Sequence, residues 1–164
     1  LEVSLFHNEV TDALRFVPPP PPPPRWANVG SYTARGAEAM FSAHPLPGLA
    51  IFLGAAWTRT EPAAVPYTPE WTGSGGATYA RGAWRFSLDL QQLSAQETGN
   101  LRFPGAPVRL DGYLLANGRI AWRMDRTGLE LFVAGENLGD VDYAYRAGYP
   151  MPSRNVLTGA SWSF

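Results

Sequence analysis

The chain has 164 residues, enough for one ordinary domain, and carries a formal net charge of −1 with only 16% charged residues. This balance offers no basic patch or stripe of the kind that nucleic acid binding requires, so we expect no nucleic acid partner. Because the chain has no cysteine, disulfide bonds and thiolate metal sites are excluded.

Apolar and polar residues alternate with a period of two along most of the chain, which is typical of β-strands. Aromatic residues make up 13% of the chain, yet its mean hydropathy is −0.17, as expected when apolar and polar residues are interleaved. No apolar run reaches the ~18 residues that a membrane helix needs. The pattern predicts an all-β chain with strands at residues 1–10, 29–44, 49–60, 70–80, 84–96, 108–124, 128–138 and 154–164.

Short and long connections alternate between these strands. In an antiparallel up-and-down sheet, all short turns then lie at one edge and all long loops at the other, which is the asymmetry of outer-membrane barrels. The first long link, residues 11–28, contains seven consecutive prolines, which predict a stiff extended rod that serves either as a spacer or as an arm that binds a ligand or partner. The short turns are 45–48, 81–83 and 125–128, and the other long links are 61–69, 97–108 and 139–153.

Each predicted strand has one apolar and one polar face. Alternation alone does not decide whether the apolar face meets lipid or the dry interior of a soluble, lipocalin-like barrel. Two bands of tryptophan at opposite ends of the strands favour the membrane, because indole prefers the interface between headgroups and hydrocarbon. Trp57 and Trp71 lie toward the long loops, and Trp84, Trp122 and Trp162 lie near the short turns. The polar face, which would line a watery lumen, carries Arg85, Asp89, Asp111, Arg119, Arg123, Glu130 and Glu136.

Two other motifs suggest chemistry only weakly. His7 with Asp12 is the one histidine–carboxylate combination near the long loops, and the second histidine, His44, lies at the opposite edge of the predicted sheet. The glycine-rich Gly73–Gly76 stretch is followed by neither Lys-Ser/Thr nor a helix, so it does not predict a phosphate-binding loop. We therefore expect no enzyme activity, no metal site and no cofactor.

The C-terminal segment "GENLGDVDYAY", followed by "GYPMPSRNVLTGASWSF", resembles the end of TonB-dependent outer-membrane receptors. In that family an Asn-Leu-x-Asp…Tyr segment leads into an external loop, and a last strand ends on Phe. "GAEAMFS" (36–42) and "VPYTPEW" (65–71) also resemble strands and loops of that barrel. The matching signature positions are Asn137, Leu138, Asp140, Tyr143, Tyr149 and Arg154.

The resemblance implies a fold, a location and a function. The fold is an antiparallel, up-and-down transmembrane β-barrel segment of about eight strands, the last third of a 22-stranded barrel, with the plug domain and the earlier strands absent. Residues 11–28 would then form a proline-rich extracellular loop. The implied function is active uptake, across the outer membrane of a Gram-negative bacterium, of a scarce nutrient such as a ferric siderophore or cobalamin, energised by TonB through the missing plug. A complete eight-stranded outer-membrane barrel with a structural or adhesive role and a soluble ligand-binding barrel remain the alternatives.

The resemblance also suggests roles for individual residues. The alternating Ala160, Trp162 and Phe164 resemble the signal that the barrel-assembly machinery reads. Tyrosine and arginine together suit planar, anionic or metal-chelated ligands through stacking and charge. On this basis, Arg102, Tyr145 and Arg146 are candidate ligand contacts.

Overall fold

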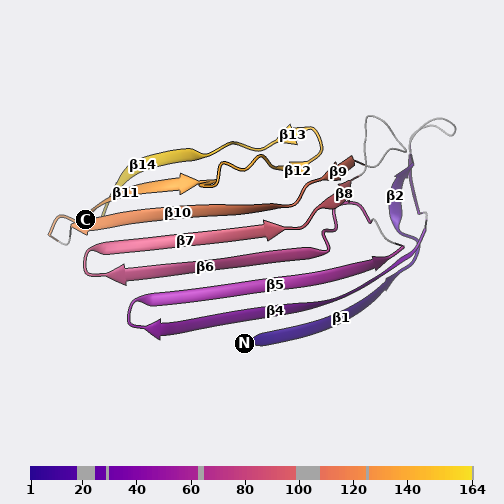
Figure 1. Cartoon of the computed structure of the whole chain (residues 1–164), viewed down its shortest axis with the longest axis horizontal. Helices are drawn as coiled ribbons and strands as arrows, with labels where there is room; N and C mark the ends of the chain where they lie inside the picture. Colours follow the sequence, from indigo (N-terminus) through magenta and orange to yellow (C-terminus); the bar gives the residue numbers. More distant parts are fainter. Residues whose placement is uncertain (18–24, 29, 63–64, 99–107, 125, 164) are drawn as a thin grey trace.

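The computed structural model describes residues 1–17, 25–28, 30–62, 65–98, 108–124 and 126–163. These residues form one curved sheet of eight long antiparallel strands, with three short two-stranded ribbons at one end (Figure 1). Each long strand pairs with the next long strand along the chain, which confirms the predicted up-and-down order. The long strands are β1 (Glu2–Val10), β4 (Tyr32–Leu46), β5 (Leu49–Glu61), β6 (Trp71–Arg81), β7 (Trp84–Leu93), β10 (Tyr113–Met124), β11 (Leu129–Glu136) and β14 (Asn155–Trp162).

No described segment is a helix long and apolar enough to cross a membrane.

The short turns all lie at the end of the sheet where β14 finishes, on the left of Figure 1. Glycines with positive φ make two of them tight, Gly48 (φ 82°) between β4 and β5 and Gly128 (φ 68°) before β11. A Cβ atom would collide with the carbonyl of Ala80 in β6 at Gly48, and with that of Ser163, just beyond β14, at Gly128. Glycine is therefore required there by both conformation and space.

The opposite end carries the three ribbons, which the alternation pattern does not predict as separate pairs of strands. The expected loop 11–28 contains the antiparallel pair β2 (Leu14–Val17) and β3 (Arg25–Asn28), while the seven prolines between them lie outside the described residues. The loop between β11 and β14 contains β12 (Ala144–Arg146) and β13 (Tyr149–Pro150).

The long strands β7 and β10 are shorter than the expected strands 84–96 and 108–124. Each stops at Leu93 or Tyr113, at the ribbon end of the sheet. β8 (Gln96–Thr98) and β9 (Val108–Leu110) pair with each other and not with the long strands. The chain bends at Gly112, where a Cβ atom would lie only 2.7 Å from the carbonyl oxygen of Leu93. Leu110, expected on the outward face of the long strand, therefore belongs to the ribbon. The alternation continues through the bend, so it did not mark the end of the strand.

The two alternative barrels do not fit this sheet. β1 and β14 form its two edges and are not paired, so the eight strands do not close into a small barrel. A soluble barrel needs a dry core, yet Tyr113, Leu115 and Ala121 are the only buried hydrophobic side chains of the described residues. Leu88 and Trp162 are 43% and 69% exposed. The apolar face is therefore not packed into a core; we call it the outward face, and the polar face the inward face.

Candidate functional site

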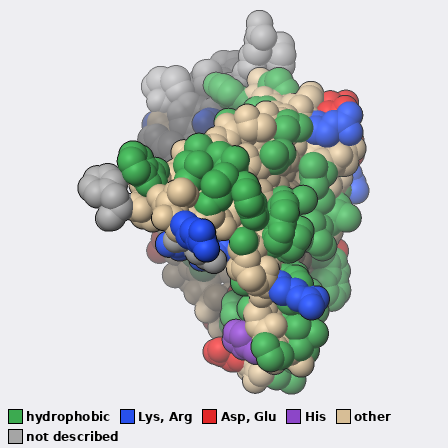
Figure 2. Space-filling model, turned by 90° about the vertical axis from the view of Figure 1, so that its left-hand side faces the viewer, with side chains coloured by type: hydrophobic (Ala, Val, Ile, Leu, Met, Phe, Trp, Pro, Cys, Tyr) green, Lys and Arg blue, Asp and Glu red, His purple; other side chains and the backbone are tan. Residues whose placement is uncertain are grey.

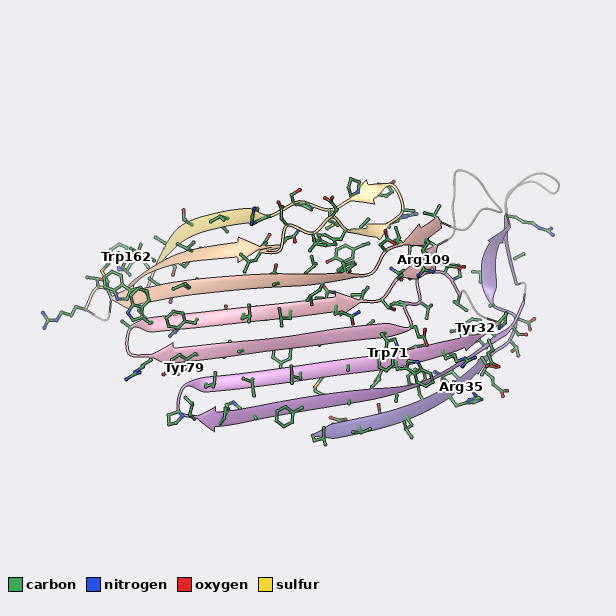
Figure 3. The ribbon with its side chains drawn as sticks, in the orientation of Figure 1. Tyr32, Arg35, Trp71, Tyr79, Arg109 and Trp162 are labelled. Carbon is green, nitrogen blue, oxygen red and sulfur yellow. The ribbon has the colours of Figure 1, made fainter. Side chains whose placement is uncertain are left out.

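The outward face carries two aromatic rows, one near each end of the strands. At the long-loop end, the rings of Trp57 and Trp71 are 6.4 Å apart on β5 and β6. At the short-turn end, the Trp84 ring lies 6.3 Å from that of Trp122 and 6.2 Å from that of Phe86. Figure 3 shows Tyr79 and Trp162 at this end and Trp71 toward the other. Apolar side chains cover much of the surface when the molecule is viewed from the short-turn end (Figure 2).

Between these rows the outward face carries no charge in the described strands. The pairing register places the nearest outward charges at Arg59, two residues beyond Trp57, and at Arg81, ten residues from Trp71. Twelve residue steps of ~3.3 Å give about 40 Å along a strand, or about 30 Å of height at the tilt of a barrel strand. This height matches the hydrocarbon core of a bilayer.

The opposite, inward face carries a repeated pairing of phenylalanine with glycine. Phe6, Phe52 and Phe132 each stand directly across from a glycine of the neighbouring strand. A Cβ atom on any of these glycines would collide with the phenylalanine ring, so each ring occupies the space that a side chain would fill at its glycine partner. The glycine partners are Gly36, Gly76 and Gly159, and Gly76 closes the glycine-rich stretch within β6.

Mixed charges on the inward face form a network across β7, β10 and β11, as the alternation predicted. Glu130, whose side chain is only 15% exposed, accepts hydrogen bonds from Arg119 Nη2 at 3.0 Å and Arg85 Nη1 at 3.4 Å. The Arg119 guanidinium also lies 4.1 Å from the centre of the Phe132 ring, close enough for a cation–π interaction. The ion pairs with Glu130 therefore hold the side chains of Arg85 and Arg119, and the Phe132 ring gives Arg119 a second contact.

The signature segment after β11 is a clamp built on Asn137. This residue is buried, with a positive φ of 48° that asparagine tolerates better than most residues. Its Oδ1 accepts the Val141 amide at 2.9 Å, its Nδ2 donates to the carbonyls of Val141 and Pro152, and its own amide donates to Asn117 Oδ1. Asn137 therefore ties β10, the start of the loop and its return into one unit.

Leu138 and Asp140 complete the clamp. Leu138 places its two methyl groups over Gly118 and Gly135, which are Cα partners on β10 and β11. Asp140 Oδ1 accepts the Arg154 amide at 2.8 Å, and its Oδ2 lies 3.6 Å from Arg154 Nη2. These contacts give the signature a structural role, because they fix where the loop leaves the sheet and returns to it.

Three tyrosines gather between the start of β10 and the loop that follows β11. The ring centres of Tyr113, Tyr143 and Tyr145 are 5.0 to 6.1 Å apart, and the hydroxyl of Tyr113 is buried without a hydrogen-bond partner among the described residues. Burial, and secondarily the neighbouring Tyr145, raises the pKa of Tyr143 above its ordinary value. Nothing in the alternation pattern singles out Tyr113, because its position on the polar face gives no sign of the loop that covers it.

The predicted ligand contacts and assembly residues are only partly within the described chain. Tyr145 is exposed and meets Tyr143 edge to face, and exposed Arg146 lies 5.7 Å from the centre of the Tyr149 ring. Arg102 and Phe164 lie outside the described residues. Of the assembly residues, Ala160 is exposed on the outward face, and Trp162 Nε1 donates to the Thr127 carbonyl at 2.6 Å.

The histidine considered for catalysis lies on the outward face. His7 Nε2 is 3.5 Å from Glu9 Oε1, both side chains are largely exposed, and no contact of His7 with Asp12 is seen within the part of the chain that is described. Among the same residues no three His, Cys, Asp or Glu side chains gather into a group that could hold a metal ion.

Comparison with known proteins places this sheet in a family. The family model described as TonB dependent receptor-like, beta-barrel matches residues 1–138. A search of curated proteins found no match. Among solved structures, the sheet is similar to the ferric-catecholate import receptor Fiu from E. coli K12, with a TM-score of 0.76 and 19% identity over 99% of this chain and 25% of the receptor.

Two further structures agree with this similarity. The copper transporter OprC gives a TM-score of 0.74 and 19% identity over 99% of this chain and 29% of the transporter. The ferripyoverdine receptor of Pseudomonas aeruginosa gives 0.72 and 17% identity over 99% of this chain and 25% of the receptor. The chain thus spans about a quarter of the length of these proteins. It belongs to the TonB-dependent receptor β-barrel family, whose members are transport receptors of the Gram-negative outer membrane and not enzymes.

Proposed function

We propose that this chain is the C-terminal part of the barrel wall of an outer-membrane receptor that takes up a scarce, metal-containing nutrient. The observation that carries the proposal is the charge-free outward band between Arg59 and Arg81, about 30 Å high and with an aromatic row near each end, on a sheet of this family. Such a band suits lipid on one side, while the arginines and glutamates of the other side suit a hydrated lumen.

The ligand we favour is a ferric siderophore, with cobalamin as the other candidate. Two of the similar structures are named for ferric-catecholate and ferripyoverdine, and a third is named as a copper transporter. Arg102, Tyr145 and Arg146 are the proposed ligand contacts, since cations and aromatic rings suit planar, anionic chelates. Uptake would be energised by TonB through a plug domain, and Ala160, Trp162 and Phe164 would guide assembly into the membrane.

Growth rescue tests this proposal. A strain that lacks the natural receptor gene would be supplied with ferric siderophores, cobalamin or copper as the limiting source, with and without an intact TonB system. We expect the gene to restore growth on one ferric siderophore only when TonB is present. Replacing Tyr145 and Arg146 by alanine should raise the siderophore concentration needed for growth, whereas replacing exposed Arg126 at the short turn should not.

Two results would refute the proposal. Growth that is restored without TonB would exclude energised uptake. A receptor that reaches the outer membrane but rescues growth on none of the supplied nutrients would exclude the proposed substrate class.

A further inference from the structure

A row of basic side chains lies on the outward face, immediately beyond the aromatic row at the long-loop end. His7, Arg35 and Arg59 are direct Cα partners on β1, β4 and β5, so they stand side by side across three strands. The next outward row toward the centre of the sheet contains Trp57, and Figure 3 shows Arg35 at the same end as Trp71. Because indole marks the edge of the hydrocarbon, the basic row lies at the depth of lipid phosphate groups.

The two arginines of this row already converge on one oxyanion. Glu61 Oε1 lies 3.2 Å from Arg35 Nη2 and 3.8 Å from Arg59 Nε, and all three side chains are more than half exposed. A guanidinium has five N–H donors, so both arginines keep donors free for another oxyanion. The carboxylates of Glu9 and Glu61 belong to the next row outward, on the water side of the arginines.

A shallow apolar trough of about 430 Å³ lies on the same outward face, directly toward the membrane from the tryptophan pair. Its floor consists of small residues, because Ala55 and Gly73 occupy the positions next to Trp57 and Trp71 in the same register. Larger apolar side chains border it. The outward lining includes the small Ala39 and Gly75, the larger Phe41, Leu53, Leu90 and Leu114, and one polar residue, Gln92.

We propose that this face binds one anionic lipid of the outer leaflet. Arg35 and Arg59 hold its phosphate group, and one of its acyl chains lies in the trough. A phosphate beside an alkyl chain is the chemistry that both features share, whereas a free phosphate would leave the trough empty. The inference rests on the outward face meeting lipid and is independent of the compound transported.

Native mass spectrometry of the full natural chain in detergent tests the proposal by titration with lipid A, which bears phosphates and acyl chains. We expect lipid A to bind at least tenfold more tightly than its phosphate-free form. Because hydrogen bonds between charged groups are strong, the double variant Arg35→Gln/Arg59→Gln should lose about tenfold or more in affinity. Ala55→Phe, which fills the trough, should also weaken binding, and inorganic phosphate should not displace the lipid.

Matched controls lie on the same face. Arg81→Gln removes an outward arginine at the short-turn end, and Ala77→Phe adds the same ring outside the trough, so both should stay within twofold of the parent. If the double variant does not assemble, the proposal is tested instead by the weaker lipid A binding expected of Arg35→Lys/Arg59→Lys and of Ala55→Phe. Equal affinity for phosphorylated and phosphate-free lipid, displacement by inorganic phosphate, or an equal loss in Arg81→Gln would each overturn the proposal. Growth rescue would be unaffected by any of these outcomes, so failure here is distinct from failure of the transport proposal.

Discussion

Replacing Leu88 by arginine tests which face of the sheet meets lipid. Leu88 is an outward residue of β7, 43% exposed, with Ala77 and Gly118 as its Cα partners. It lies four residues from Trp84, which is about 13 Å along the strand and well inside the aromatic row. An arginine at such a depth costs ~2–4 kcal/mol, so the folding equilibrium in lipid should fall by roughly 30-fold to 800-fold.

The control is Gln91→Arg on the same strand. Gln91 points to the inward face, in register with Ser74 and Leu115, where an arginine stays hydrated and should change stability by less than about 0.5 kcal/mol. Both variants of the full natural chain would be unfolded by urea from lipid vesicles, and the free energies of unfolding compared. If the two substitutions destabilise the protein equally, or if Gln91→Arg is the worse, the assignment of the faces is wrong.

Three further substitutions test the loop clamp, the paired rings and the tyrosine cluster. Asn137→Ala should cost about 2–3 kcal/mol and speed hydrogen exchange at the Val141 amide, while Asn137→Gly, which tolerates the positive φ, should recover only the conformational part of that loss. Gly159→Val should destabilise the sheet by about 1–3 kcal/mol in urea unfolding, and Phe132→Ala in the same chain should recover part of this loss by removing the ring that collides with the new side chain. Because burial raises the pKa of Tyr143, its contribution to stability should be complete below about pH 10 and lost as the pH rises through the folded-state pKa. Phenolate absorbance in the parent and in Tyr143→Phe measures this effect, and a Tyr143 that titrates at the ordinary value would contradict it.

The long strands and their faces could be predicted because they depend on local pattern alone. Period-two alternation set Trp84, Phe86 and Leu88 on one side before any pairing was known, and the register confirms that they share a face with Ile120 and Trp122. The turns were equally clear, since glycine at a position of positive φ has few substitutes. The ends of the strands were less predictable because the bend at Gly112 depends on the approach of a neighbouring strand.

The site residues were harder to predict because their partners are distant in sequence. Asn137 and Asp140 were recognised only through the family resemblance, and their hydrogen bonds to Pro152 and Arg154 require the loop to return. The phenylalanine–glycine pairs need the register, since nothing local distinguishes Phe132 on the polar face from any other aromatic residue.

The two edges of the sheet give a last physical argument for the proposed receptor. Unpaired backbone groups cost several kcal/mol each in hydrocarbon, so strands cross a membrane only within a closed barrel. β1 and β14 present open edges at the depth of the charge-free band and do not pair with each other. The stability of this sheet in lipid therefore requires partner strands on both sides, as a larger barrel would supply. In detergent, a sheet of these eight strands alone should exchange the edge amides of β1 and β14 rapidly, while the full natural chain should protect them. Equal protection of these amides in both samples would contradict the argument.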